Sequence, residues 1–278
     1  MKKDQFIVVC AEKVEDAEKL VPTARLFAEK LRKGLILLSC SPGAEEWTEQ
    51  FGIPFMALKG DWKTAIDALP TAMNAVLAIT LADPGAPRRS LTHPRTLLKK
   101  FRDCKVAYVV VNVHNTEHSS LITHHSSLTT VLTIDHQRES KEKLIWASYM
   151  ARFFGSAIRV MHRNYRDAAF KMRWRNNMRY LDKVFSSLGL SYETEVIEGG
   201  SEFGNPDLVA IKEVGGMRYE VGGERKEGCV FIALVPDRRD RDLGDLFTKP
   251  GELRLIENAT QFPVLLLNQR DDLYVLCD

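Results

Sequence analysis

The sequence predicts an α/β protein made of two tandem domains, each with a five-stranded parallel sheet flanked by helices. Three observations support this expectation. The chain has 278 residues, which suits two domains of about 110 to 150 residues better than one. Short apolar runs alternate with helical periodicities along the whole chain, as in parallel sheets covered on both faces. The order of these elements also restarts near the middle of the chain, which indicates an internal repeat.

The first half opens with an apolar run, Phe6 to Cys10, that has the pattern of a strand buried on both faces. A helical periodicity follows up to Gly34, which we expect to end the helix, and Pro22 suits an early turn of that helix better than its interior. Val106 to Val111 is the most strand-like segment of this half. Between these segments we expect strands at Leu35–Leu38, Phe55–Leu58 and Ala75–Ile79, and helices at Glu45–Phe51, Trp62–Met73 and Thr92–Arg102.

A segment rich in Ser, Thr, Asn and His, from about Asn112 to Thr130, is the expected linker. We therefore place the two domains at residues 1–120 and 126–278. Gly155 ends the first helix of the second half, in the place that Gly34 takes in the first. The expected strands are Val131–Asp135, Ala157–Met161, Thr194–Ile197, Val230–Val235 and Val264–Leu267; the expected helices are Glu139–Phe154, Asp167–Leu188, Pro206–Val214 and Gly251–Ala259, with a glycine-rich insert at Gly215–Gly228.

The composition is that of an ordinary globular protein, with 45% hydrophobic and 27% charged residues. No apolar run approaches the ~18 residues of a membrane helix and the chain opens without a signal peptide, so we expect a cytoplasmic protein with no membrane partner. The net charge of +2 lacks the basic footprint of proteins that bind nucleic acid. Five scattered cysteines without a C-x-x-C pair indicate reduced thiols and no metal site.

The opening of the second half, Val131 to His162, resembles the universal stress protein family. In that family a strand ending in Asp leads to a helix rich in Ser, Glu and Lys and then to a glycine. Asp135, Ser140 and Gly155 match this pattern, and the closing strand, Pro263 to Asn268 (PVLLLN), is similar as well. The resemblance implies Rossmann-like domains of the adenine-nucleotide α-hydrolase type.

The same resemblance implies an intramolecular pseudo-dimer. In single-domain members the last strands of two subunits pair, so a tandem chain is expected to pair Val106–Val111 with Val264–Leu267 and thereby hide two sheet edges. The terminal run Asp271 to Asp278 is also strand-like, and it could cover another edge or form a homodimer.

Family members that bind ATP have a glycine, two residues, a second glycine, nine residues, and a third glycine before Ser or Thr. With Gly251 as the third glycine, Arg238 and Arg241 replace the other two and Glu252 stands at the hydroxyl position. The lost pattern predicts no conventional ATP binding and no cofactor, although the two arginines could bind an anion directly. Asp135 would either orient an adenosine-type group or cap the following helix. These four residues, Asp135, Arg238, Arg241 and Gly251, are the candidate ligand site.

The first half departs further from the family pattern. The loop from Leu81 to Pro94 has one glycine, Gly85, with Arg88 and Arg89 nearby. Cys10 stands where the resemblance places an Asp at the end of the first strand. We therefore expect the first domain to be degenerate.

Two other features have a functional and a structural interpretation. A histidine-rich linker can bind metal, but the absence of carboxylates at fixed spacing favours a solvated segment. The helix Asp167 to Leu188 is rich in Lys and Arg, which suits contact with nucleic acid or a membrane, but its apolar residues at helical spacing favour packing on the core.

The first functional hypothesis is a stress-response protein that binds a small ligand or a protein partner and is not an enzyme. The alternative is an ATP-binding or ATP-hydrolysing switch that uses the second domain. A third hypothesis is a scaffold that binds nothing small. The missing glycines favour the first over the second, since residues at a site and not the fold determine function.

Overall fold

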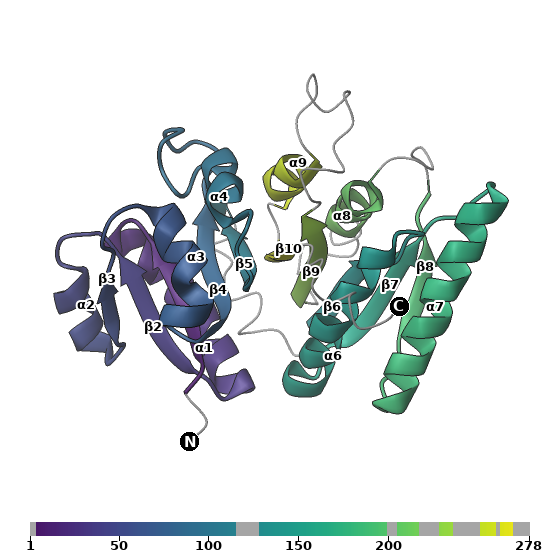
Figure 1. The fold of residues 1–278 in the computed structure, drawn as a ribbon, viewed down its shortest axis with the longest axis horizontal. Helices are drawn as coiled ribbons and strands as arrows, with labels where there is room; N and C mark the ends of the chain where they lie inside the picture. The colour runs from purple at the N-terminus through teal and green to yellow at the C-terminus, as the bar shows by residue number, and fades with distance from the viewer. Residues whose placement is uncertain are drawn as a thin grey trace, which may run out of the picture.

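The computed structural model describes residues 4–114, 128–198, 205–216, 228–235, 251–259 and 262–268. Its centre is a ten-stranded sheet with the order β3-β2-β1-β4-β5-β10-β9-β6-β7-β8, and helices cover both faces (Figure 1). Within the described ranges no helix has the length and the apolar character needed to cross a membrane.

Each half contributes five parallel strands. The first half comprises β1 (Phe6–Ala11), α1 (Val14–Leu31), β2 (Gly34–Ser39), α2 (Ala44–Phe51), β3 (Phe55–Ala57), α3 (Trp62–Ala72), β4 (Ala75–Ala82), α4 (Pro94–Phe101) and β5 (Ala107–Asn112). The second half comprises β6 (Leu128–Thr133), the 3₁₀ turn η2 (Arg138–Glu142), α6 (Lys143–Phe154), β7 (Ala157–His162), α7 (Ala168–Ser187), β8 (Glu193–Val196), α8 (Pro206–Gly216), β9 (Gly228–Val235), α9 (Gly251–Asn258) and β10 (Val264–Asn268).

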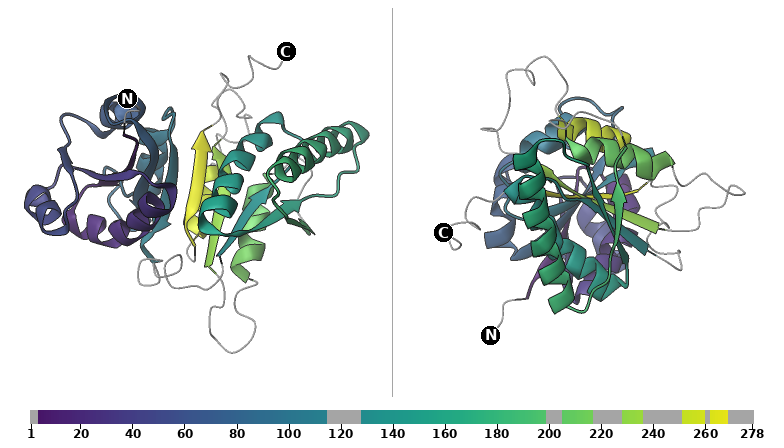
Figure 2. Two further views of the ribbon diagram at one scale, coloured as in Figure 1. Left: turned by 90° about the horizontal axis from the view of Figure 1, so that it is seen from below. Right: turned by 90° about the vertical axis from the view of Figure 1, so that its right-hand side faces the viewer.

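The two halves meet at β5 and β10, which pair antiparallel at the centre of the molecule (Figure 2). Val264, Leu265 and Leu266 pair with Val110, Val109 and Tyr108, which confirms the predicted pairing. Because both strands are apolar and buried on both faces, the pairing hides two edges that would otherwise be open to aggregation.

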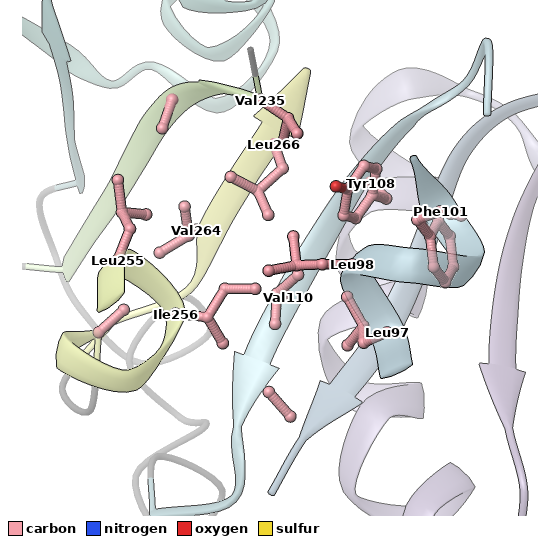
Figure 3. Close-up of a cluster of buried hydrophobic side chains, with 14 of the residues drawn as sticks. Leu97, Leu98, Phe101, Tyr108, Val110, Val235, Leu255, Ile256, Val264 and Leu266 are labelled. Carbon is pink, nitrogen blue, oxygen red and sulfur yellow. The ribbon is translucent and has the colours of Figure 1, made fainter. Parts of the chain in front are cut away.

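Side chains from both halves form continuous cores across this junction. On one face Leu97, Leu98 and Phe101 of α4 face Leu255 and Ile256 of α9 across the two strands (Figure 3). On the other face the rings of Phe27 in α1 and Phe154 in α6 pack against each other with centroids 4.8 Å apart and a tilt of 56°.

The last residues of the junction strands also bind across it. Asn112, at the end of β5, donates to the carbonyl of Ile256 at 3.3 Å. Asn268, at the end of β10, donates to the carbonyls of Phe101 and Cys104 at 2.7 and 2.8 Å. The last strand of each half therefore donates hydrogen bonds to the last helix, or the turn after it, of the other half, as expected for an approximate two-fold axis.

The end of α1 differs from the prediction. Arg32, not Gly34, adopts the left-handed conformation that ends the helix, with φ 53°, and Gly155 does so in the second half, with φ 67°. Gly34 instead is the first residue of β2. A glycine suits this position because the ring of Phe6 lies 2.5 Å from where a Cβ atom would be. The two glycines are therefore not equivalent, and Gly34 corresponds to Ala157.

Two further predictions were wrong in detail. Pro22 lies inside α1, where it faces solvent, so water can bind the carbonyl left without a partner in the preceding turn. Residues 128–130, which we assigned to the linker, begin β6, because the sheet's pairing with β7 and β9 extends to them. Residues 115–127 lie outside the described ranges, so the domain boundaries at 120 and 126 stay a prediction.

Replacing Gly34 with Ala should destabilise the protein by about 1 to 3 kcal/mol, because the new methyl group would overlap the Phe6 ring. Gly215→Ala is the matched control: no atom lies within 4 Å of its Cβ position, and it sits in a helix that Ala favours. Urea unfolding of both variants measures the difference, and equal stabilities would contradict the close approach.

Candidate functional site

In open α/β sheets ligands bind where neighbouring parallel strands send their helices to opposite faces. The chain has two such places. In the first half α1 follows β1 onto one face, while α4 follows β4 onto the other. In the second half α6 and α9 follow β6 and β9 in the same way. The candidate sites are therefore the carboxyl ends of these two strand pairs.

At the second of these places a buried lysine is bound by two side chains. Lys143, the first residue of α6, donates from Nζ to Asp207 Oδ1 at 2.8 Å and Oδ2 at 3.1 Å. It also donates to Thr133 Oγ1 at 2.9 Å, and that hydroxyl donates to Asp207 Oδ1 at 2.5 Å. Thr133 ends β6 and Asp207 lies in the first turn of α8, so three elements meet here. We call Thr133, Lys143 and Asp207 the lysine cluster.

The lysine cluster is closed to water. The side chains of Lys143 and Asp207 are 3% and 5% exposed, and Thr133 is fully buried. Asn205 accepts from the Asp207 amide at 2.8 Å, which fixes the start of α8. A buried ion pair is held only when both charges are paired and hydrogen bonded, and here every partner is supplied by the chain itself.

Asp135 lies beside the cluster at the carboxyl end of β6. Its Oδ1 accepts from the Gln137 amide at 2.9 Å, so it stabilises the local turn and does not cap a helix. Asn177 of α7 donates to the carbonyls of Asp135 and Gln137 at 2.9 and 2.7 Å and so fixes this turn from outside. Burial raises the pKa of Asp135 above its ordinary value, and the nearby Lys143 opposes that shift only in part.

The other predicted site residues separate into two groups. Gly251 opens α9 at the same edge of the sheet, with the Asn205 amide group 3.3 Å from its Cβ position. Gly251 and Asp135 are thus brought to the same end of the β6 and β9 pair. Arg238 and Arg241 lie outside the described residues.

The first half retains an acid at the position of Asp135, contrary to the prediction from Cys10. Phe6 pairs with Gly34, and Thr129 pairs with the equivalent Ala157, so the two repeats can be aligned residue by residue. On this alignment Cys10 corresponds to Thr133 and Glu12 to Asp135. The prediction failed because strand registers, which the sequence does not display, decide the equivalence.

Glu12 uses its longer side chain to bind the loop between β4 and α4. Its carboxylate accepts from the hydroxyl of Ser90, and from the Leu91 amide at 2.7 Å. Ser90 and Thr92 also hydrogen bond each other through their hydroxyls at 2.8 Å. Hydroxyl and amide donors that converge on a negative charge form an anion site, and here the anion is the chain's own carboxylate.

A small cavity of about 300 Å³ lies next to this region, at the carboxyl ends of β2 and β3. Its lining includes Cys40, Gly43 and Glu45, with apolar contributions from Phe55 and Leu58. Burial, together with the charge of Glu12, raises the pKa of Cys40, so this thiol stays protonated near neutral pH. Glu45, which lines this cavity, and Glu46 occupy the first turn of α2, so the charge here disfavours an anion.

Sequence reasoning missed Glu12, Lys143 and Asp207. Lys143 and Asp207 stand at helix starts, where a charged residue usually faces water, and nothing in their spacing links them. Glu12 follows a strand, as the predicted acid should, but two positions later than expected.

No family model matches the sequence, and no curated protein matches it. Solved structures do match. A universal stress protein from Archaeoglobus fulgidus DSM 4304 aligns with a TM-score of 0.59 and 13% identity over 96% of this chain and 97% of that chain. The chain has a universal stress protein fold.

Two other solved structures align with the same fold. A protein from Pseudomonas aeruginosa UCBPP-PA14 assigned to the universal stress proteins aligns with a TM-score of 0.59 and 14% identity over 96% of this chain and 94% of that one. The cytoplasmic domain of a prokaryotic cation chloride cotransporter aligns at 0.52 and 12% over 95% of both chains. In the universal stress protein fold seen here, charged side chains of the chain itself occupy the carboxyl ends of both strand pairs.

Replacing Lys143 with Ala should destabilise the protein by about 3 to 5 kcal/mol, because Asp207 would remain buried without its counter-ion. The double variant Lys143→Met with Asp207→Leu should recover most of that loss, since it removes both charges and keeps the volume. Urea unfolding compares the three proteins. A double variant as unstable as the single one would show that the lysine cluster does not act as a coupled pair.

Replacing Glu12 with Ala should free the loop that precedes α4. The amide of Leu91 should then exchange its hydrogen faster, because it loses its acceptor. Glu15→Ala, an exposed change in the first turn of α1, serves as control. Unchanged exchange at Leu91 in the Glu12 variant would contradict the contact.

Proposed function

We propose that this chain is a cytoplasmic, universal stress protein-like stress-response protein. It acts by binding a protein partner or a small ligand, without conventional ATP binding and without catalysing a reaction. One observation carries the proposal: among the described residues, the Ser90 hydroxyl, the Leu91 amide and the Lys143 ammonium, which a phosphate could use at the carboxyl ends of the strands, are bound to acidic side chains of the chain itself.

In the first half the carboxylate of Glu12 holds the donors that a phosphate would need. The Ser90 hydroxyl and the Leu91 amide both bind Glu12, so an incoming phosphate would have to displace it. Two negative charges also cannot share these donors without strong repulsion, which water-excluded surroundings increase. The first half therefore disfavours a triphosphate.

In the second half the buried ammonium group of Lys143 is likewise bound to an acid of the chain. Lys143 would be the natural partner of a phosphate, but Asp207 and Thr133 already satisfy it. Releasing Lys143 would leave the Asp207 carboxylate buried and unpaired, at a cost of several kcal/mol. Asp135 is a poor partner for phosphate because it is itself acidic and close by.

The alternative function, an ATP-binding or ATP-hydrolysing switch in the second domain, requires these contacts to open. The free energy of ligand binding would then have to exceed the cost of breaking the ion pair. Such a switch would depend on Asp135, the acid that the family resemblance assigns to an adenosine-type group. The two functions therefore differ in a single measurable quantity, which is saturable ATP binding that depends on Asp135.

Isothermal titration with ATP and Mg²⁺ should give no saturable heat with the unaltered protein or with the Asp135→Ala variant. Glu12→Ala is a useful third sample, because it removes the competing carboxylate from the first half. Saturable binding by the unaltered protein that disappears in Asp135→Ala would overturn the proposal and favour the switch.

A further inference from the structure

The outer face of α6 is apolar where a surface helix is normally polar. Ile145, Tyr149 and Phe153 follow one another at intervals of four residues and are 51%, 42% and 43% exposed. Trp146, which is partly exposed, contacts Tyr149 edge-on at 5.6 Å, and Tyr149 contacts Phe153 at 5.9 Å between ring centroids. We call these four residues the α6 stripe. A continuous apolar and aromatic surface of this kind marks a contact site.

The fold does not require such a stripe. α1 follows β1 as α6 follows β6, and both helices pack on the same face of the sheet (Figure 1). On the alignment of Gly34 with Ala157, the positions of the α6 stripe are taken in α1 by Pro22, Thr23, Leu26 and Lys30. None of these four α1 residues is aromatic, whereas Trp146, Tyr149 and Phe153 of the α6 stripe are, so at this structural position the aromatic surface is confined to the second half.

We propose that the α6 stripe binds the α6 stripe of a second copy of this chain, in an antiparallel pair centred on Tyr149. When α6 is turned end for end about Tyr149, Ile145 exchanges places with Phe153 and Trp146 with Arg152. In such a pair Ile145 meets Phe153 and Tyr149 meets Tyr149 of the other copy, while Trp146 meets Arg152. An isologous interface needs this self-complementarity, in which residue i meets j and j meets i.

The one charge on the outer face of α6 also finds a partner in this arrangement. Arg152 is exposed and has the position that meets Trp146 of the second copy. A guanidinium over an indole ring is favourable, and Trp is the best of the aromatic partners. The charge of Arg152 therefore has a partner in the second copy of α6, and no acidic residue is needed in the contact.

The neighbouring helix gives the interface a salt dependence. α7 contacts α6, and Lys141 of η2 lies 5.0 Å from the Tyr180 ring of α7. The exposed side of α7 is basic, with Arg175, Arg179 and Lys183 against Asp182. A two-fold axis perpendicular to α6 brings α7 of one copy toward α7 of the other, so added salt strengthens self-association by screening these charges. An acidic partner or an anionic membrane would show the opposite dependence.

Sedimentation equilibrium tests the inference on the full chain. The unaltered protein should form dimers at micromolar concentration, and Tyr149→Glu should raise the dissociation constant about tenfold or more, because it buries a charge at the centre of the contact. Phe51→Glu is the matched control, since Phe51 is an exposed aromatic residue, 48% exposed, on α2 of the first half. The proposal is wrong if the protein is monomeric, or if Tyr149→Glu and Phe51→Glu behave alike.

A cross-link tests the geometry. In a background with Cys40→Ser and Cys277→Ser, the variant Tyr149→Cys should form a disulfide between chains, because the two-fold axis passes through this residue. Glu18→Cys, at an exposed position on α1, should not. Dimers that cross-link at neither position, or at both equally, would contradict the antiparallel pair.

Two further results would overturn the inference in favour of other occupants. A monomer that sediments with vesicles of phosphatidylglycerol and loses this binding in Phe153→Glu would assign the α6 stripe to a membrane surface. Self-association that weakens as salt is added would require acidic residues in the contact. The inference extends the proposed partner binding but is measured separately from it: ATP titration tests the strand ends, and sedimentation tests the α6 stripe.

Discussion

The antiparallel pairing of β5 with β10 fixes where everything else in the molecule lies. It joins ten strands into one sheet, buries two edges, and relates the halves by an approximate two-fold axis. Asn112 and Asn268 then bind the opposite half at equivalent places. Because the strands of the two halves run in opposite directions, their carboxyl ends lie at opposite ends of the strands in the joined sheet. The two candidate sites are therefore separate.

Each half has an acidic residue after its first strand, and the two acids bind different partners. Asp135 turns back on the amide of Gln137 and leaves the cation of Lys143 to Asp207. Glu12, one methylene longer, reaches the loop before α4 and occupies its donors. In both halves, within the part of the chain that the structure describes, carboxylates of the chain bind donors at the strand end. Donors bound in this way are held in place and are not free to bind a phosphate.

Much of the fold could be predicted from the sequence because periodicity and burial agree in it. The alternating elements and the repeat follow from apolar patterns, whereas the pairing of Val106–Val111 with Val264–Leu267 was expected from the family resemblance and its register came from the structure. The site could be predicted only in part. Asp135 and Gly251 were found from a family pattern, whereas the pairing of Lys143 with Asp207 depends on the tertiary approach of α6 and α8. Arg32 ends α1 in the left-handed conformation that we expected of Gly34, because a single residue other than glycine can adopt that conformation.

The proposed function depends on Lys143, which Asp207 and Thr133 bind, being unavailable to a nucleotide. The ammonium protons of a buried, hydrogen-bonded lysine exchange slowly, so ¹H–¹⁵N spectroscopy of the protein can observe this group directly. We expect a protected ammonium signal that disappears in Lys143→Met and does not move when ATP and Mg²⁺ are added. A signal that is absent from the unaltered protein, or one that shifts as ATP is added, would contradict it.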